Sequence, residues 1–243
     1  MHKDFSIFLT PLLGALTSFA ALTVLAVLTI SQPAYSQNLL DNIDLTSPEM
    51  TEAETTRSAI IAQIENAAKS GEALDLSHKR LSGLDLSNLN LSGAILRSAR
   101  LNGTSLVGAD LSRAVLDQAW MLNADLSKAN LSNAHLFQAQ MIGAILNDAN
   151  LSGARLASNL TKAKLINANL SHVDFEYARL DRANLTDADL RSATMGGAYL
   201  MGTNVTRVKF DKADMTSTTL KELIGAETAN LETAANLNRS YRE

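Results

Sequence analysis

A period of five residues runs through most of this chain and leaves few folds open to it. In residues 124–144, ADLSKANLSNAHLFQAQMIGA, Leu or Met recurs at every fifth position, and an Ala stands two positions before each. This period is neither the two of a strand nor the 3.6 of a helix. A short fixed period indicates stacked units that bury their apolar sides only against one another.

The period can be followed from residue 74 to about residue 222. Its central apolar residues occupy every fifth position from 76 to 156 and, after one unit that is a residue short near Ala157, from 160 to 220. Of these 30 centres 23 are Leu, and 20 of the positions two residues earlier are Ala, so chance does not explain the pattern. The short unit predicts a kink or corner defect. Lys79 occupies an inward position, and because a buried charge is costly we expect a loose first turn.

Such a period fits a square coil in which five residues make one side. The central residue and the Ala point inward, the other three point outward, and four sides close a turn of 20 residues. About seven and a half turns then use the whole run. Burying each large central residue contributes about 1.5–3 kcal/mol, so a Leu and Ala core is sufficient even though aromatic residues make up only 5% of the chain. The expected fold class is an all-β solenoid.

The units ADLSK, ANLSN, ANLSG and ANLTD resemble the A-(D/N)-L-x-x signature of the pentapeptide-repeat family. The resemblance covers residues 74–222 and implies the family's fold, a right-handed quadrilateral β-helix. It says less about function, because one fold serves many functions. Members that carry a signal peptide are found in the periplasm or the thylakoid lumen, so the resemblance to this exported type implies one of these compartments.

Residues 1–36 have the layout of an export signal. Lys3 precedes an apolar run from Phe5 to Ile30, and Pro33, Ala34 and Ser36 follow it, which is typical of a signal peptide cleaved before Gln37. The same run is long enough to span a bilayer as an uncleaved anchor. We therefore expect contact with a membrane only if residues 1–36 are retained.

The ends of the coil need covers. In residues 37–73 a linker leads to a predicted helix with Ser47 as its cap, Pro48 in its first turn and Gly71 at its end. In residues 223–243 a cap or tail follows, with a helical segment expected over 218–238 and interrupted near Gly225. Both are interpreted as short helical caps of the coil, and the second leaves self-association open.

No catalytic, metal or cofactor motif is found, and we predict no enzyme and no cofactor. The chain has no Cys, no Gly-rich phosphate loop and no G-x-S-x-G motif. His78 and His135 are expected on one side of the coil but three turns apart. His172 and Asp174 lack the third ligand that a metal site normally needs.

Charge argues against two functions that act through DNA. Some members of the family mimic DNA and bind a topoisomerase with an acidic surface. Here residues 74–222 hold 14 acidic and 16 basic residues, a net of +2, while residues 37–73 carry −5 and residues 223–243 carry −1. A net of +2 is neither a phosphate mimic nor a nucleic-acid-binding stripe. A membrane-anchored or cytoplasmic regulator that acts by mimicry remains the alternative function.

The outward columns of the coil point to one candidate surface. Residues 20 apart are expected to be neighbours, which places an Asn and Ser ladder on one side and a different set on another. That set is a predicted partner patch of Arg100, Trp120, Leu122, Phe137 and Ile142, with Arg100 stacked on Trp120. The alternative is that Phe137 and Ile142 fold over their neighbours and bind nothing. From the sequence we expect an exported scaffold that binds an unknown protein partner or a second copy of itself.

Overall fold

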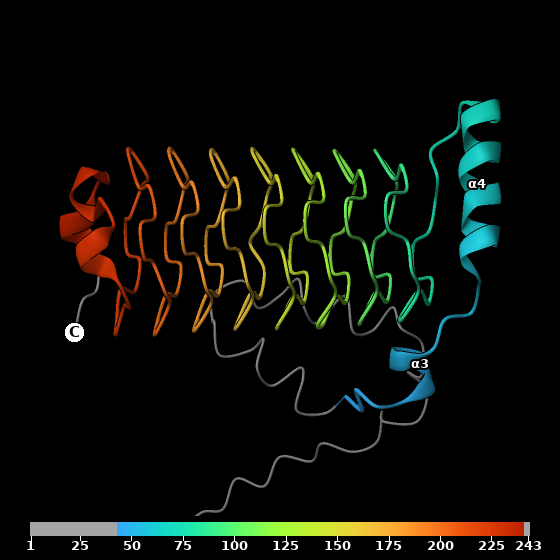
Figure 1. The fold of residues 1–243 in the computed structure, drawn as a ribbon, viewed down its shortest axis with the longest axis horizontal. Helices are drawn as coiled ribbons and strands as arrows, with labels where there is room; N and C mark the ends of the chain where they lie inside the picture. The colour runs from blue at the N-terminus through green and yellow to red at the C-terminus, as the bar shows by residue number, and fades with distance from the viewer. Residues whose placement is uncertain (1–42, 241–243) are drawn as a thin grey trace, which may run out of the picture. The chain divides into compact units, whose positions relative to one another are not determined.

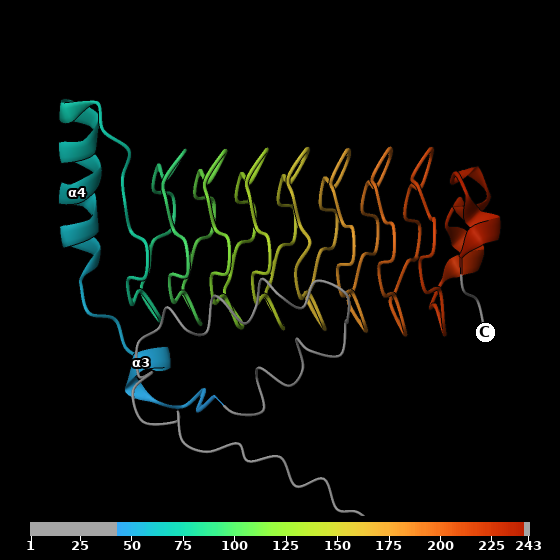
Figure 2. The same ribbon diagram turned by 180° about the vertical axis from the view of Figure 1, so that it is seen from behind.

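The computed structural model describes residues 43–240. The predicted signal peptide or anchor, residues 1–36, lies outside the described residues. In chain order the structure has helix α3 (Pro48–Thr51), helix α4 (Arg57–Ser70), a long coil, and the 3₁₀ helices η1 (Ala226–Thr228), η2 (Leu231–Thr233) and η3 (Leu237–Arg239). No helix within residues 43–240 is long and apolar enough to cross a membrane. Figures 1 and 2 show the coil from opposite sides, with α4 at its first turn and the 3₁₀ helices at its last.

Each five-residue unit forms one side of the coil and ends in a tight turn. In the unit centred on Leu126, the Ala129 N–H donates to the Leu126 carbonyl at 3.0 Å, and Lys128 has a left-handed φ of 60°. A positive φ at this place is the one that a type II turn requires. Single parallel bridges join the unit to the turns on either side, at Ser105↔Asp125 and Asp125↔Ile145. Pairing of this kind continues along the coil from Asp75 to Ala235.

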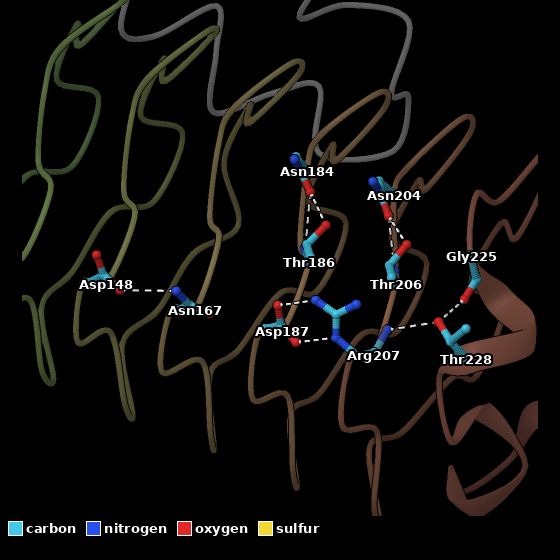
Figure 3. Close-up of polar contacts among 10 residues, drawn as sticks. All are labelled: Asp148, Asn167, Asn184, Thr186, Asp187, Asn204, Thr206, Arg207, Gly225 and Thr228. Atoms are coloured by element: carbon cyan, nitrogen blue, oxygen red, sulfur yellow. Dashed lines mark hydrogen bonds and ion pairs between the residues drawn. The ribbon is translucent and has the colours of Figure 1, made fainter.

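The polar residues of the repeat hold each turn from outside. Asn184 Oδ1 accepts hydrogen bonds from the Thr186 N–H (3.0 Å) and hydroxyl (2.6 Å), and Asn204 receives the same pair from Thr206 at 2.9 and 2.6 Å (Figure 3). Short polar side chains satisfy a turn's backbone in this way. The preference for Asn or Asp before the centre and Ser or Thr after it therefore has a local physical cause.

The core of the coil consists of the inward residues that the period predicts. Leu126 and Ala124 are both fully buried, as are almost all residues at the equivalent positions of the later turns. The expected loose first turn is present, because Leu74, Leu84 and Leu89 at its inward positions are only partly buried, and Lys79 does not point into the core. The Lys79 side chain is half exposed, and Nζ lies 3.2 Å from Glu54 Oε1. The ammonium therefore pairs with a carboxylate of the segment before the coil instead of being buried.

The short unit near Ala157 is absorbed at one corner. Bridges before it join residues 20 apart, whereas the next bridges, such as Gln140↔Asn159, join residues 19 apart. The residue that this unit lacks is the left-handed corner residue, since no positive φ occurs between Gly153 and Lys162. Ser158 takes the place of the Ala and is buried. The predicted corner defect is present, and backbone pairing continues through it.

The helical segment before the coil is broken into two. Pro48 opens α3 and Gly71 ends α4 with a left-handed φ of 72°, but residues 52–56 separate the two helices. Thr56 caps α4 by accepting a hydrogen bond from the Ala59 N–H at 3.3 Å. The apolar side of α4 contributes Ile60, which is fully buried in the same core as the coil.

The C-terminal segment continues the winding instead of forming one helix. The Met215 N–H donates to Ala235 O at 3.0 Å, and the Phe210 N–H donates to Asn230 Oδ1 at 2.6 Å. Leu231 and Leu237 pack partly buried against the core. The three 3₁₀ helices thus take the place of the helix expected over residues 218–238.

Candidate partner-binding face

The coil has four faces, each formed by one unit per turn, and each is named here by its central residues. Face 1 follows Leu76, Leu96, Leu116, Leu136, Leu156, Phe175, Met195 and Met215; face 2 follows Leu81, Leu101, Met121, Met141, Leu160, Leu180, Leu200 and Leu220; face 3 follows Leu86, Leu106, Leu126, Leu146, Leu165, Leu185 and Val205; face 4 follows Leu91, Leu111, Leu131, Leu151, Leu170, Leu190 and Phe210.

Charge is unevenly divided among these faces. Face 2 carries seven basic and two acidic residues, a net of +5, and face 1 carries two basic and five acidic residues, a net of −3. Faces 3 and 4 carry −1 and +1. The basic residues of face 2 are Lys79, Arg80, Arg100, Lys162, Arg179, Arg182 and Lys221. The coil therefore has one clearly basic face, although its total net charge is only +2.

Face 4 is a regular polar wall. Asn130 Nδ2 donates to Asp110 Oδ1 at 3.1 Å, Asn150 Nδ2 to Asn130 Oδ1 at 3.3 Å, and Asn169 Nδ2 to Asn150 Oδ1 at 3.0 Å. These side chains satisfy one another from turn to turn. The Asn and Ser ladder expected from the sequence is confirmed.

Face 2 brings four of the five predicted patch residues together. Arg100 and Trp120 are paired neighbours in the ladder. Leu122 directly follows the central residue Met121, and Ile142 directly follows the central residue Met141. All four are half-buried. Phe137 is on face 1, around the corner, and is 47% exposed. The structure therefore places a small apolar area of Trp120, Leu122 and Ile142 on the basic face.

Arg100 is not an open surface residue. Its side chain is only 12% exposed, because its guanidinium lies against the segment that contains α3. Nη2 lies 3.3 Å from Glu49 Oε2, and Nη1 donates to the Glu49 carbonyl at 3.2 Å. The predicted patch must be corrected on this point, since Arg100 already has an acidic partner within the chain.

Residues 47–54, called the strap from here on, lie along the first two turns of face 2. Asn102 Nδ2 donates to the Met50 carbonyl at 3.0 Å, and the Glu54 N–H donates to the Arg80 carbonyl at 3.0 Å. Met50 is 5% exposed. The strap thus presents one buried apolar side chain with carboxylates on either side.

Glu54 is the second acidic contact of the strap. Its carboxylate lies 3.2 Å from Lys79 Nζ and 3.3 Å from Arg80 Nε. The hydrogen bond from Lys79, followed by that from Arg80, lowers the pKa of Glu54 from its ordinary value. The first two turns of face 2 therefore offer three cations, and strap carboxylates pair with all three.

Sequence reasoning missed three exposed apolar side chains on the later turns. Tyr177, Met201 and Ile224 are exposed, Tyr177 by 70%. Met201 is on face 2, and its N–H donates to Asp181 Oδ1 at 3.3 Å. Met201 directly follows the central residue of its unit, as Leu122 and Ile142 do, so the same spacing in the sequence predicts that it points outward on face 2.

Residues 43–240 contain no group of three His, Asp or Glu side chains that could hold a metal ion. His78 and His135 are on face 1 and three turns apart, as expected, and His172 is on face 4. A groove of about 290 Å³ lies between α4 and the first turns, and Glu72 is the one acidic residue among those that line it.

Two comparisons with known proteins match the chain. The family described as "Pentapeptide repeats (8 copies)" matches residues 75–113, 119–157, 149–191 and 183–221. A solved structure of QnrB1, a plasmid-mediated fluoroquinolone resistance protein, covers 70% of this chain and 90% of its own, with 21% identity and a TM-score of 0.53. The predicted right-handed quadrilateral β-helix is confirmed. No curated protein sequence matches.

Two further solved structures are similar to the chain. HetL, a pentapeptide repeat protein involved in heterocyst differentiation regulation from the cyanobacterium Nostoc sp. strain PCC 7120, is 27% identical over 73% of this chain and 97% of its own, with a TM-score of 0.48. A pentapeptide repeat protein from the Arabidopsis thaliana thylakoid lumen is 32% identical over 37% of this chain and 66% of its own, with a TM-score of 0.32.

Proposed function

The chain belongs to the pentapeptide-repeat family, and from this premise we propose that it is an exported, non-enzymatic scaffold that binds a protein partner through face 2. The observation that carries the proposal is the apolar area formed by the half-buried side chains of Trp120, Leu122 and Ile142 on a face with a net charge of +5. Aromatic and aliphatic side chains surrounded by cations are typical anchors of protein interfaces.

Faces 3 and 4 offer less for a partner to bind. Face 4 satisfies its own polar groups through the Asn ladder. On face 3, both carboxylate oxygens of Asp187 lie 2.6 Å from Arg207 nitrogens (Figure 3). Polar groups already bonded to each other contribute little to a new interface, because binding would have to replace those bonds. Face 1 exposes Phe137 and Tyr177 but has a net charge of −3, whereas face 2 combines an apolar area with basic residues, and we infer that face 2 is the binding surface.

We infer export from the signal-like layout of residues 1–36, and we propose the periplasm or the thylakoid lumen as the compartment. The test is the intact mass of the native protein from fractionated cells. A chain that begins at Gln37 in an exported fraction supports the proposal, and a full-length chain in the membrane fraction would make residues 5–30 an anchor.

The alternative, a membrane-anchored or cytoplasmic regulator that mimics DNA, has less support. A mimic of DNA needs continuous negative charge along its surface. The most acidic face of this coil is face 1, at −3, and it also carries Arg97 and Arg155. The likeness to QnrB1 is a likeness of fold.

The binding proposal is tested by placing charge on face 2. The variant L122K/I142K puts two Lys side chains in the apolar area without touching the core. The matched control V107K/I166K changes two half-buried apolar residues at the same place in the repeat on face 3. We expect the face 2 variant alone to lose association in pull-down from the native compartment and in light scattering. Unchanged association in both measurements would contradict the proposal.

A further inference from the structure

The strap binds face 2 as a separate peptide would. Glu49 and Glu54 pair with cations of the first two turns, and Met50 is buried between them. The contacts alternate between charge, apolar burial and a backbone hydrogen bond, and they come from residues 25 to 52 positions away in the chain. Short peptide ligands are recognised in the same manner, by a few anchors and main-chain bonds.

The strap also fits imperfectly. Ser82 is 3% exposed, and within the described residues its Oγ has no hydrogen-bond partner. Ser82 lies between two strap contacts, because the Glu54 N–H bonds to Arg80 and the Thr51 carbonyl lies beside Gly83. A buried hydroxyl without a partner destabilises the contact that covers it. A ligand that supplied an acceptor to Ser82 Oγ would add a hydrogen bond that the strap does not make.

The strap site and the apolar area are continuous. The Asn102 side chain donates to the Met50 carbonyl and accepts from the Leu122 N–H at 3.0 Å. Trp120 is paired with Arg100 in the ladder. An acidic chain bound at the strap site therefore reaches Trp120 and Leu122 without crossing another face.

We propose that the strap is a built-in ligand, and that face 2 binds a partner segment of the same chemistry: a short acidic peptide with one long apolar side chain between two carboxylates. The net charge of +5 on face 2 gives the complementary field. This inference rests on the proposed function and names its partner class. The partner displaces the strap and extends over Trp120 and Leu122.

The test uses the mature chain and a synthetic peptide of residues 47–56, SPEMTEAETT, with a fluorescent label. In the variant E49A/M50A/E54A the strap is weakened, and circular dichroism checks that the coil is retained. We expect the peptide to bind this variant with a Kd below about 1 mM, which is the effective concentration that a short tether supplies. Binding to the unaltered chain should be at least about tenfold weaker, because the strap competes. Trp120, the sole Trp of the chain, reports binding through its own fluorescence.

Two controls make the test specific. A peptide with Lys in place of both glutamates that correspond to Glu49 and Glu54 should not bind. Adding R100A/N102A to the strap-weakened variant should abolish binding of the acidic peptide. Binding should also weaken as salt rises, since the carboxylates lie near the surface.

Two results would overturn the inference. No binding of the acidic peptide at about 1 mM, with the coil intact, would mean that the strap is held only by its tether. Dimerisation of the strap-weakened variant without peptide binding would identify a second copy as the occupant. Either result leaves the test of L122K/I142K against V107K/I166K unaffected, so a failure of the inference and a failure of the proposed function are distinguishable.

Discussion

The side-chain amide of Asn102 joins the strap to the coil: its Nδ2 donates to the Met50 carbonyl at 3.0 Å. Its Oδ1 accepts from the Leu122 N–H of the next turn, also at 3.0 Å. One half-buried side chain thus bonds both the segment that covers the first turns of face 2 and the backbone of the apolar area. The covered and open parts of face 2 form one surface.

Replacing Asn102 by Ala is expected to loosen the strap. The change removes one hydrogen bond to the Met50 carbonyl, which contributes about 0.5–1.5 kcal/mol. Hydrogen exchange of the amides in residues 47–56 should become faster while the coil is unchanged. The control is N147A. Asn147 Oδ1 accepts a hydrogen bond from the Ile166 N–H on face 3, just as Asn102 Oδ1 accepts one from the Leu122 N–H, but Asn147 does not contact the strap. Equal exchange in the two variants would refute the strap contact.

Replacing Leu126 by Ala is expected to destabilise the coil strongly. Leu126 is fully buried at the centre of its unit, with turns packed on both sides. The free energy of unfolding should fall by about 2–5 kcal/mol, which is the cost of the lost burial and the cavity. Urea denaturation measures this loss. The control S132A, an outward residue of the next unit, should change the free energy of unfolding by less than about 0.5 kcal/mol, and similar losses in both would contradict the inward assignment.

The coil is expected to lose stability in acid. The hydrogen bond from Arg207 lowers the pKa of Asp187 from its ordinary value, and hydrogen bonds from Ser77, Ser87 and Arg191 do the same for Asp75, Asp85 and Asp189. A lowered folded-state pKa stabilises the fold above the unfolded value of about 3.9. This stabilisation is lost as pH falls through the lowered pKa values.

The measurement is the Tm between pH 2 and pH 6. The Tm should decrease as the pH is lowered below about 4. The Tm of D187N should decrease less steeply than that of the unaltered chain, because D187N has no carboxylate at position 187 to protonate. A D187N curve parallel to that of the unaltered chain would show that the Asp187–Arg207 pair makes no contribution.

Replacing Gly225 by Ala is expected to disrupt the C-terminal cap. Gly225 has a φ of 73°, and a Cβ there would lie 2.9 Å from Thr206 Cα. The control G93A has a φ of 68° with no atom within 4 Å, so it carries the backbone strain without the clash. Proteolysis in residues 226–240 should increase in G225A and stay unchanged in G93A, whose strain alone costs roughly 1 kcal/mol. Protection of the cap in G225A would contradict this account.

The repeat could be predicted from the sequence because its forces are local. Three features each have a physical cause within one or two units: the Leu and Ala spacing, the preference for Asn or Asp before the central residue, and the missing residue near Ala157. The C-terminal units Ala229-Asn230-Leu231 and Ala235-Asn236-Leu237 repeat the same motif six residues apart, so a strict search for a period of five misses them.

The strap could not be predicted in this way. Its contacts join residues far apart in the chain, such as Glu49 and Arg100, and no period relates them. The period does not predict the pairing of Lys79 with Glu54 or of Arg100 with Glu49 for the same reason. It describes the coil alone, and a carboxylate from outside the coil determines where each side chain lies.

The most direct test of face 2 is photo-crosslinking from single positions in the native compartment. A photoreactive amino acid at position 122 faces the proposed partner, and the same residue at position 107 occupies the equivalent place on face 3. A discrete crosslinked product from position 122 and none from position 107 is the predicted result. Products from both positions, or from 107 alone, would contradict the assignment of partner binding to face 2.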